Sequence, residues 1–225
     1  MKDKSNSPAA PAASAASPVL KVSKASQRKA QLHEDLIACA TRRIAAHGAH
    51  GLRARDLASD AGCSVGAIYN VFEDLEALIL HVSLQTLGAI DEVMAANARE
   101  RAACSQEEIL TGLAERYCDF VVQNTHSWRS LFEHALPEGV ELPDWIIEKQ
   151  ISLLGHVRRP LAQLMPTASD EKINSTARLL FSAVHGVVNL AVDQRTVGLA
   201  LDEVKRELRF LVQMFVAGVE KGRAE

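Results

Sequence analysis

The sequence predicts an all-α protein, with a three-helix head near its N-terminal end and a longer helical body behind it. Apolar residues recur three and four positions apart through most of the chain, strand-like alternation is absent, and the Pro and Gly turn signals lie far apart. At 225 residues the chain is long enough for two domains or one elongated helical body. We expect a tail at residues 1–27, the head at 28–80 and the body at 81–225.

The predicted tail is rich in Ala, Pro, Ser and Lys and contains no aromatic residue. Such a segment buries too little apolar surface to offset the entropy lost on ordering, so we expect disorder. It also lacks the apolar core of a secretory signal.

The head prediction depends on the segment 51–80, where Gly62-Cys63-Ser64 separates two short helical patterns. Gly62 can adopt the left-handed conformation that ends a helix, and Ser64 is a good N-cap for the next one. In that second helix, about Val65–Phe72, the positions of Ile68 and Phe72 predict a buried stripe, and Tyr69 and Asn70 fall outside it.

Asp74 can cap a third helix, whose apolar positions include Leu75, Leu78, Ile79 and Val82. This layout is typical of a helix-turn-helix that places its second helix in the DNA major groove. From geometry alone, any small three-helix packing unit remains an equal alternative.

A longer pattern favours the DNA-binding interpretation. Positions 58–72 read Ala-x-x-Ala-Gly-x-Ser-x-Gly-x-x-Tyr-x-x-Phe, which resembles the signature of the TetR/AcrR family of transcriptional regulators, with Cys63 replacing a Val. Residues 36–48 resemble the first helix of that family. The resemblance implies a DNA-binding head, a body that binds an effector and dimerises, and a protein that is not an enzyme.

Three positions depart from the family pattern. Arg53 stands where Thr or Ser is common, Val65 where Lys or Gln is common, and Leu75 where a Lys often grips a phosphate. We therefore expect backbone contacts to shift to basic residues beside the motif; for Arg28 and Lys29 a solvated role is an equal alternative. The predicted DNA-binding residues are Arg28, Lys29, Arg53, Arg55, Ser64, Val65, Gly66, Ala67, Tyr69 and Asn70.

The charge distribution agrees with this division, although ordinary fluctuation would also explain it. The formal net charge is −3; residues 1–80 hold ten basic and eight acidic side chains, and the remainder holds 15 and 20. A mildly basic end on an acidic body suits a DNA-binding head on a sensor.

Metal and membrane partners are not predicted. The four cysteines, Cys39, Cys63, Cys104 and Cys118, are widely spaced without a CxxC pair, so no zinc site, cofactor or disulfide framework is implied. Apolar runs break well before the roughly 18 residues of a membrane span. We expect a cytoplasmic protein.

The body is expected to be helical throughout, with a loop around Pro137, Gly139 and Pro143 and a kink or split at Pro160. The predicted helices are Leu75 to about Ala96, Gln106–Gln123, Trp128–Ala135, Asp144–Leu164, Ser169–Gln194 and Leu201–Gly222. Three pieces resemble the WHG C-terminal domain of some TetR-like regulators: residues 128–134 (Trp-x-x-Leu-Phe-Glu-His), residues 142–145 (Leu-Pro-Asp-Trp) and residues 184–186, where Val-His-Gly replaces Trp-His-Gly.

The last two predicted helices are apolar on nearly all sides, which suggests a core on one side and a partner subunit on the other. We therefore predict a homodimer whose seam, the surface shared by the two subunits, contains these helices. The alternative is a helix fully buried within a monomer. Candidates for the seam's centre are Val184, Val188, Leu211 and Phe215.

Within the penultimate helix, Ser182, His185, Asn189 and Asp193 form one polar stripe. The stripe either contacts a ligand or pairs with polar groups across the dimer interface or on a neighbouring helix, since buried polar groups need partners. The predicted effector-binding residues are Tyr117, Phe120, Trp128, Phe132, Trp145, Phe181, His185 and Asn189. Ordinary core packing is the alternative for these aromatic residues.

Taken together, these patterns predict a homodimeric transcriptional repressor that a small, mostly apolar effector releases from its double-stranded DNA operator. The alternative is a DNA-binding scaffold whose body docks a protein partner and binds no effector. No nucleophile motif or metal set supports an enzyme.

Overall fold

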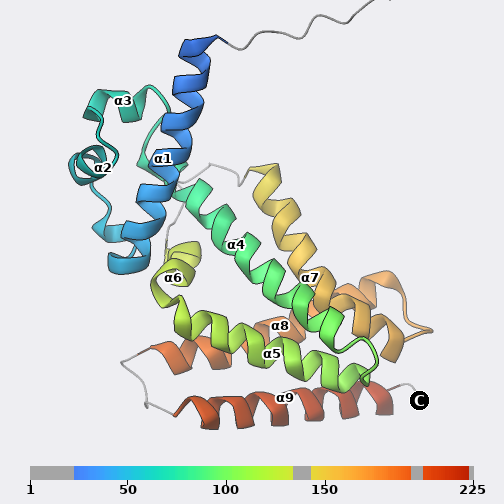
Figure 1. Cartoon of the computed structure of the whole chain (residues 1–225). Helices are drawn as coiled ribbons and strands as arrows, with labels where there is room; N and C mark the ends of the chain where they lie inside the picture. Colours follow the sequence, from blue (N-terminus) through green and yellow to red (C-terminus); the bar gives the residue numbers. More distant parts are fainter. Residues whose placement is uncertain (1–22, 134–142, 194–199, 223–225) are drawn as a thin grey trace, which may run out of the picture.

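The computed structural model describes residues 23–133, 143–193 and 200–222, and every regular element in these ranges is a helix (Figure 1). The predicted all-α fold is thus confirmed. The elements are α1 (Lys24–His47), η1 (Ala49–Gly51), α2 (Ala54–Asp60), α3 (Val65–Tyr69), α4 (Leu75–Glu100), α5 (Gln106–Gln123), α6 (Thr125–Glu133), α7 (Asp144–Leu164), α8 (Asp170–Val192) and α9 (Leu201–Lys221).

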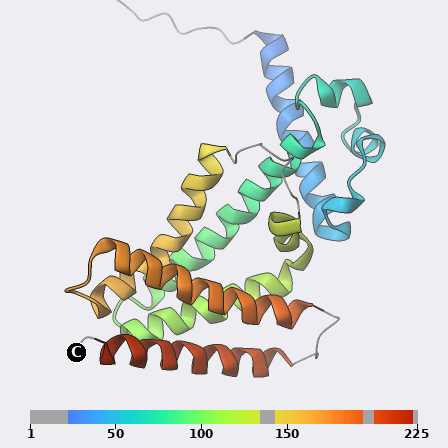
Figure 2. The same cartoon turned by 180° about the vertical axis from the view of Figure 1, so that it is seen from behind.

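The helices form two groups. In Figures 1 and 2, α1, α2 and α3 make up a head at one end, and α9 lies at the opposite edge of the body, antiparallel to α8. Helix α4 starts in the head and runs into the body, so it belongs to both. The first turns of α4 and α7 lie on the side of the body that faces the head.

Local signals place the head helices as predicted. Gly62 has φ 63°, a left-handed conformation that favours glycine, in the turn between α2 and α3. The Ser64 hydroxyl accepts from the Ala67 N–H at 3.2 Å, and the Asp74 carboxylate accepts from the Ala77 N–H at 2.7 Å. These caps fix where α3 and α4 begin.

Several helix boundaries differ from those expected. Helix α1 begins at Lys24, inside the predicted tail, because the Ser23 hydroxyl accepts from the Ser26 N–H. Helix α3 ends at Tyr69 rather than near Phe72. Helix α4 continues to Glu100, where buried Asn97 donates to the Ile109 carbonyl and ties the end of α4 to α5.

Pro160 does not split its helix. Helix α7 is continuous to Leu164, with Pro160 and Leu161 buried. Proline removes one backbone hydrogen bond, and this packing offsets that loss. The predicted loop at Pro137 and Gly139 lies outside the described residues, as do the His134 and Leu142 positions used in the WHG comparison.

Each group has its own hydrophobic core. The head core joins α1, α2, α3 and the first turns of α4, with Leu36, Leu57, Ile68 and Leu78 fully buried. The body core joins α4 to α9. The thiols of Cys39 and Cys118 are buried in the head and body cores respectively.

Two described helices, α4 and α8, are long and apolar enough to cross a membrane by length and composition alone. Core helices of soluble proteins pass the same test. Here α4 contributes to both cores, and α8 packs against α7 and α9.

Candidate functional site

The helix predicted to read DNA presents the expected faces. Ile68 and Phe72 are buried in the head core at 0% and 4% exposure, whereas Tyr69 is 49% exposed and Asn70 is also exposed. Val65, at the start of α3, is exposed as well. Some side chains of this short segment therefore pack in the head core, and others point outward.

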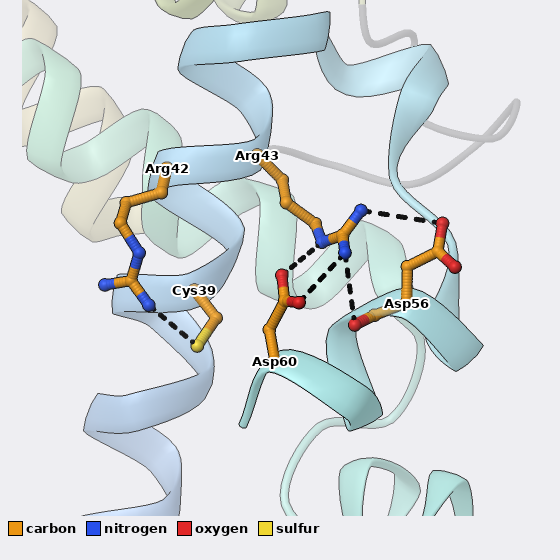
Figure 3. A network of polar contacts seen from close by, with 5 residues as sticks. All are labelled: Cys39, Arg42, Arg43, Asp56 and Asp60. Carbon is orange, nitrogen blue, oxygen red and sulfur yellow. Dashed lines mark hydrogen bonds and ion pairs between the residues drawn. The ribbon is translucent and has the colours of Figure 1, made fainter. Parts of the chain in front are cut away.

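An ion-pair network holds α2 against α1 (Figure 3). The Arg43 Nε donates to Oδ2 of Asp60 at 2.5 Å, and its Nη2 donates to Oδ1 at 3.0 Å. The same guanidinium reaches the backbone carbonyl of Asp56 at 3.4 Å and its carboxylate at 3.5 Å. Hydrogen bonding from Arg43 lowers the pKa of Asp60. Because α2 supports α3, this clamp also positions the exposed face of α3.

The cations predicted to contact DNA are exposed and form no ion pair with any residue that the structure describes; they are Arg28, Lys29, Arg53 and Arg55. Unpaired surface cations beside an exposed helix are the groups that phosphate contacts require. Every predicted DNA-binding residue is thus exposed on the head except Ala67, which is half-buried.

The body contains a partly open cavity of about 530 Å³. All six body helices contribute to its wall, and no lining residue carries a charge. The lining residues are Leu80, Ser83, Leu87, Ile90, Met94, Leu110, Leu113, Ala114, Tyr117, Trp128, Ser130, Leu131, Phe132, Ile146, Gln150, Leu153, Leu154, Val157, Leu180, Phe181, Val184 and Val212.

The predicted effector residues divide into two sets. Four of them, Tyr117, Trp128, Phe132 and Phe181, line the cavity. The other four are absent from its wall, and sequence periodicity could not separate the two sets. Phe120 packs elsewhere against the body core, Trp145 stacks on His81, Asn189 is exposed, and His185 lies behind Tyr117.

His185 belongs to a hydrogen-bonded relay behind the cavity wall. The indole N–H of Trp128 donates to the Tyr117 hydroxyl at 2.9 Å, and that hydroxyl lies 2.9 Å from Nδ1 of His185. An indole can only donate, so the arrangement that satisfies all three groups has Tyr117 donating to Nδ1. Burial raises the pKa of Tyr117 to about 12, and burial lowers the pKa of His185. Both groups are therefore neutral near pH 7.

The rest of the polar stripe does not enter the cavity. Ser182 and Asn189 are exposed on α8, and neither lines the cavity. The partner of His185 is Tyr117 of the same subunit, so the contact that satisfies it is intramolecular.

The sequence prediction assigned no α4 residue to the cavity wall, and its one α7 residue, Trp145, does not line the cavity. Leu80, Leu87 and Met94 form a second apolar stripe on α4, in addition to the stripe that enters the head core. A second stripe on one helix indicates a second packed surface, and this signal could have identified α4. The α7 residues carried no comparable signal.

Helix α7 is also tied to α4 by charge. Asp91 accepts from Lys149 Nζ at 2.6 Å and lies 2.7 Å from Nε2 of His156. Burial opposes ionisation of Asp91, but these two hydrogen bonds outweigh it and lower the pKa of the carboxyl. No sequence pattern joins residues that lie 58 and 65 positions apart.

Of the residues predicted for the centre of the dimer seam, Val184 and Val188 face the inside of the subunit, whereas the seam position of half-exposed Leu211 and Phe215 stays a prediction. Val184 and Val188 are buried in the body core, and Leu211 and Phe215 pack partly buried against it. The outward faces of α8 and α9 instead expose Leu179, Leu190, Phe210 and Met214. A helix apolar on both sides leaves its inner face ambiguous in sequence, because periodicity alone does not say which side meets the core.

Comparison with known proteins agrees with this architecture. Residues 110–215 match a family model described as the tetracyclin repressor-like C-terminal domain. No curated protein sequence matches the chain. The narrower resemblance to the WHG type stays a prediction.

Solved structures share the fold. A TetR-family regulatory protein from Rhodococcus RHA1 aligns with TM-score 0.58 and 17% identity, covering 82% of this chain and 97% of that chain. The regulator FadR from Bacillus subtilis, in complex with stearoyl-CoA, aligns with TM-score 0.62 and 18% identity, covering 80% and 97%. The fatty acid degradation regulator FadR from Bacillus halodurans gives 0.60 and 19%, covering 83% and 95%.

At these identities the structural likeness establishes the shared fold, and the family model identifies the body. The head adds a helix-turn-helix with the signature spacing, an outward-facing second helix and unpaired cations beside it. Residues 110–215 are thus a tetracyclin repressor-like C-terminal domain, and the chain has the fold of solved structures described as TetR-family transcriptional regulators.

Proposed function

We propose that this protein is a cytoplasmic, homodimeric repressor that leaves its operator when an uncharged, mostly apolar group occupies the cavity of the body. The observation that carries the proposal is the cavity itself, about 530 Å³ in volume with no charged residue in its wall. Small-molecule sites are typically concave and mostly apolar, with few polar groups that orient the ligand.

The wall also restricts the ligand. A buried charge without a partner costs several kcal/mol or more, so an ionised group cannot lie within this lining. A long hydrocarbon chain suits it, with any charged portion left outside. The likeness to a FadR bound to stearoyl-CoA supports an acyl chain as the first candidate.

The alternative scaffold function would need a filled body and an exposed apolar patch for a protein partner. The cavity argues against the first requirement. The exposed apolar residues of α8 and α9, namely Leu179, Leu190, Phe210 and Met214, are assigned to a second copy of the chain. An isologous contact requires only one self-complementary patch. Two heads held this way would have to meet successive major grooves about 34–36 Å apart.

The effector proposal can be tested with labelled tryptophan. The chain has two tryptophans, so incorporation of 5-fluorotryptophan gives two ¹⁹F resonances, and Trp145→Phe assigns them. We expect stearoyl-CoA or 1-octadecanol to move the resonance of Trp128, which lines the cavity. Free coenzyme A is the control and should leave it unmoved. An unmoved Trp128 resonance at saturating concentrations of both long-chain probes would remove the acyl assignment.

Repression is tested on a duplex selected from a random-sequence pool for tight binding to this protein. A chain that enriches no duplex contradicts the DNA-binding function itself. If a duplex is enriched and neither long-chain probe weakens its binding, the head functions as proposed and the effector assignment is wrong.

A further inference from the structure

Four aromatic rings from four separate segments meet where the head joins the body. His33 on α1 stacks on Phe72, which follows the reading helix, at a centroid distance of 4.7 Å. His81 on α4 lies 5.1 Å from His33 and 5.5 Å from Phe72. On its other side His81 stacks on Trp145, with centroids 5.6 Å apart and ring planes at 24°.

This cluster connects two regions that otherwise have separate cores. Phe72 is 4% exposed and belongs to the head core. Trp145 is the second residue of α7, and its neighbour Ile146 lines the cavity. Gln150 and Leu154 carry the cavity wall farther along the same helix. Figures 1 and 2 place the first turn of α7 on the side that faces the head.

We propose that the Trp145–His81 stack is the joint through which occupancy of the cavity is transmitted to the reading helix. The inference rests on the proposed function, because it assigns a route between its two sites. A helix moves largely as a unit, so a ligand that displaces the wall residues of α7 also displaces Trp145. Through His81 the displacement reaches Phe72, which follows the end of α3, and His33, which lies within α1.

The coupling at this joint depends on the shape of the packed rings rather than on a hydrogen bond. Offset and edge-on aromatic pairs have preferred geometries, so a cluster of four rings has few alternative packings. Packed groups of this kind switch between discrete arrangements rather than deform continuously. Both His81 and Trp145 act as positioning residues, since neither lines the cavity nor lies on the reading helix.

Coupling between two sites is reciprocal, so the joint can be tested from the DNA side without knowledge of the effector. In protein labelled with 5-fluorotryptophan, the selected duplex should move the Trp145 resonance. The shift should disappear in His81→Ala and return in His81→Phe, which restores a ring. A Trp145 resonance that stays in place under saturating duplex in the wild-type protein would overturn the proposal.

A second measurement compares operator affinity with and without stearoyl-CoA. Trp145→Ala should bind the duplex and the acyl probe, yet reduce the release of DNA by about tenfold, within the usual range of coupling between sites. Trp145→Phe should retain release. Ile151→Ala, an exposed position on the same helix, is the matched control. Full release from Trp145→Ala would show that the signal travels elsewhere.

Failure of the joint and failure of the proposed function give different results. If the wild-type protein binds no duplex, the proposed regulatory function and this inference are both wrong. If the wild-type protein binds duplex but not stearoyl-CoA, the acyl assignment is wrong. The inference is then tested only by whether duplex binding moves the Trp145 resonance.

Discussion

The hydroxyl of Tyr117 lies between Trp128 and His185, accepting from the indole N–H at 2.9 Å with the imidazole Nδ1 also at 2.9 Å. Helices α5, α6 and α8 meet at this oxygen. Tyr117 and Trp128 line the cavity, and His185 supports them from behind. A single oxygen therefore fixes two rings of the wall.

Replacing Tyr117 by Phe removes that oxygen and leaves the buried Trp128 N–H without a partner. An unsatisfied buried donor costs about 1–3 kcal/mol, so the free energy of unfolding should fall by about that amount. Urea denaturation measures it. Tyr69→Phe, at an exposed position in the head, is the control and should leave stability nearly unchanged. Equal stability of the two variants would contradict the relay.

The pH dependence of stability should depend on His81. Burial, and then the nearby His33 imidazole, lower the pKa of His81 below its ordinary value of 6.5, with Glu34 partly opposing them. As the pH falls below the ordinary imidazole range, the unfolded chain binds a proton before the folded one does, so stability decreases.

His81→Phe removes this titration and should flatten the loss of stability between neutral and mildly acidic pH. Thermal denaturation across that range measures the slope. His50→Phe, an exposed histidine of the head, is the control. A slope that His81→Phe leaves unchanged would show that His81 makes no contribution to the acid sensitivity.

Substitutions on the exposed and the buried side of the reading segment should have different effects, the first on DNA recognition and the second on stability. Asn70→Ala should relax base preference at one operator position by about 1–3 kcal/mol while the protein stays folded. Ile68→Ala, in the head core, should instead lower stability by about 2–5 kcal/mol. Binding to operator variants and urea denaturation separate the two. Loss of stability without loss of base preference in Asn70→Ala would reverse the assigned orientation.

The Arg43–Asp60 clamp should stabilise the head. Arg43→Met removes both hydrogen bonds to Asp60 and should lower Tm and weaken operator binding, because α2 loses its tie to α1. Salt screens exposed charges, so the difference from the wild type should shrink at high ionic strength.

The neighbouring Arg42→Met serves as the control for the clamp. Arg42 donates to Sγ of Cys39 instead and makes no contact with Asp56 or Asp60 in Figure 3. A Tm unaffected by Arg43→Met, or lowered equally by both changes, would show that the clamp does not stabilise the head.

The exposed apolar residues of α8 and α9 predict which surface forms the dimer interface. Phe210 on α9 and Ile151 on α7 are both 65% exposed in one subunit. A charge at Phe210 would occur twice across a two-fold interface, so Phe210→Asp should dissociate the dimer, whereas Ile151→Asp should not. Sedimentation velocity distinguishes them. A stable Phe210→Asp dimer would place the interface on another surface.

The sequence by itself determined the local features of this protein. Gly62, Ser64 and Asp74 specify a turn and two caps from groups only a few residues apart, and the structure has all three. Periodicity also separated buried Ile68 from exposed Tyr69, because one helix has one inner face.

Only the tertiary structure decided how distant segments combine. Trp128 and Trp145 are equally apolar in sequence, yet one lines the cavity and the other stacks on His81 at the junction with the head. Val184 and Phe210 lie on helices that are apolar on several sides, and packing turns the first inward and the second outward. Local periodicity reports that a face is apolar, but which surface covers that face depends on contacts between residues far apart in the chain.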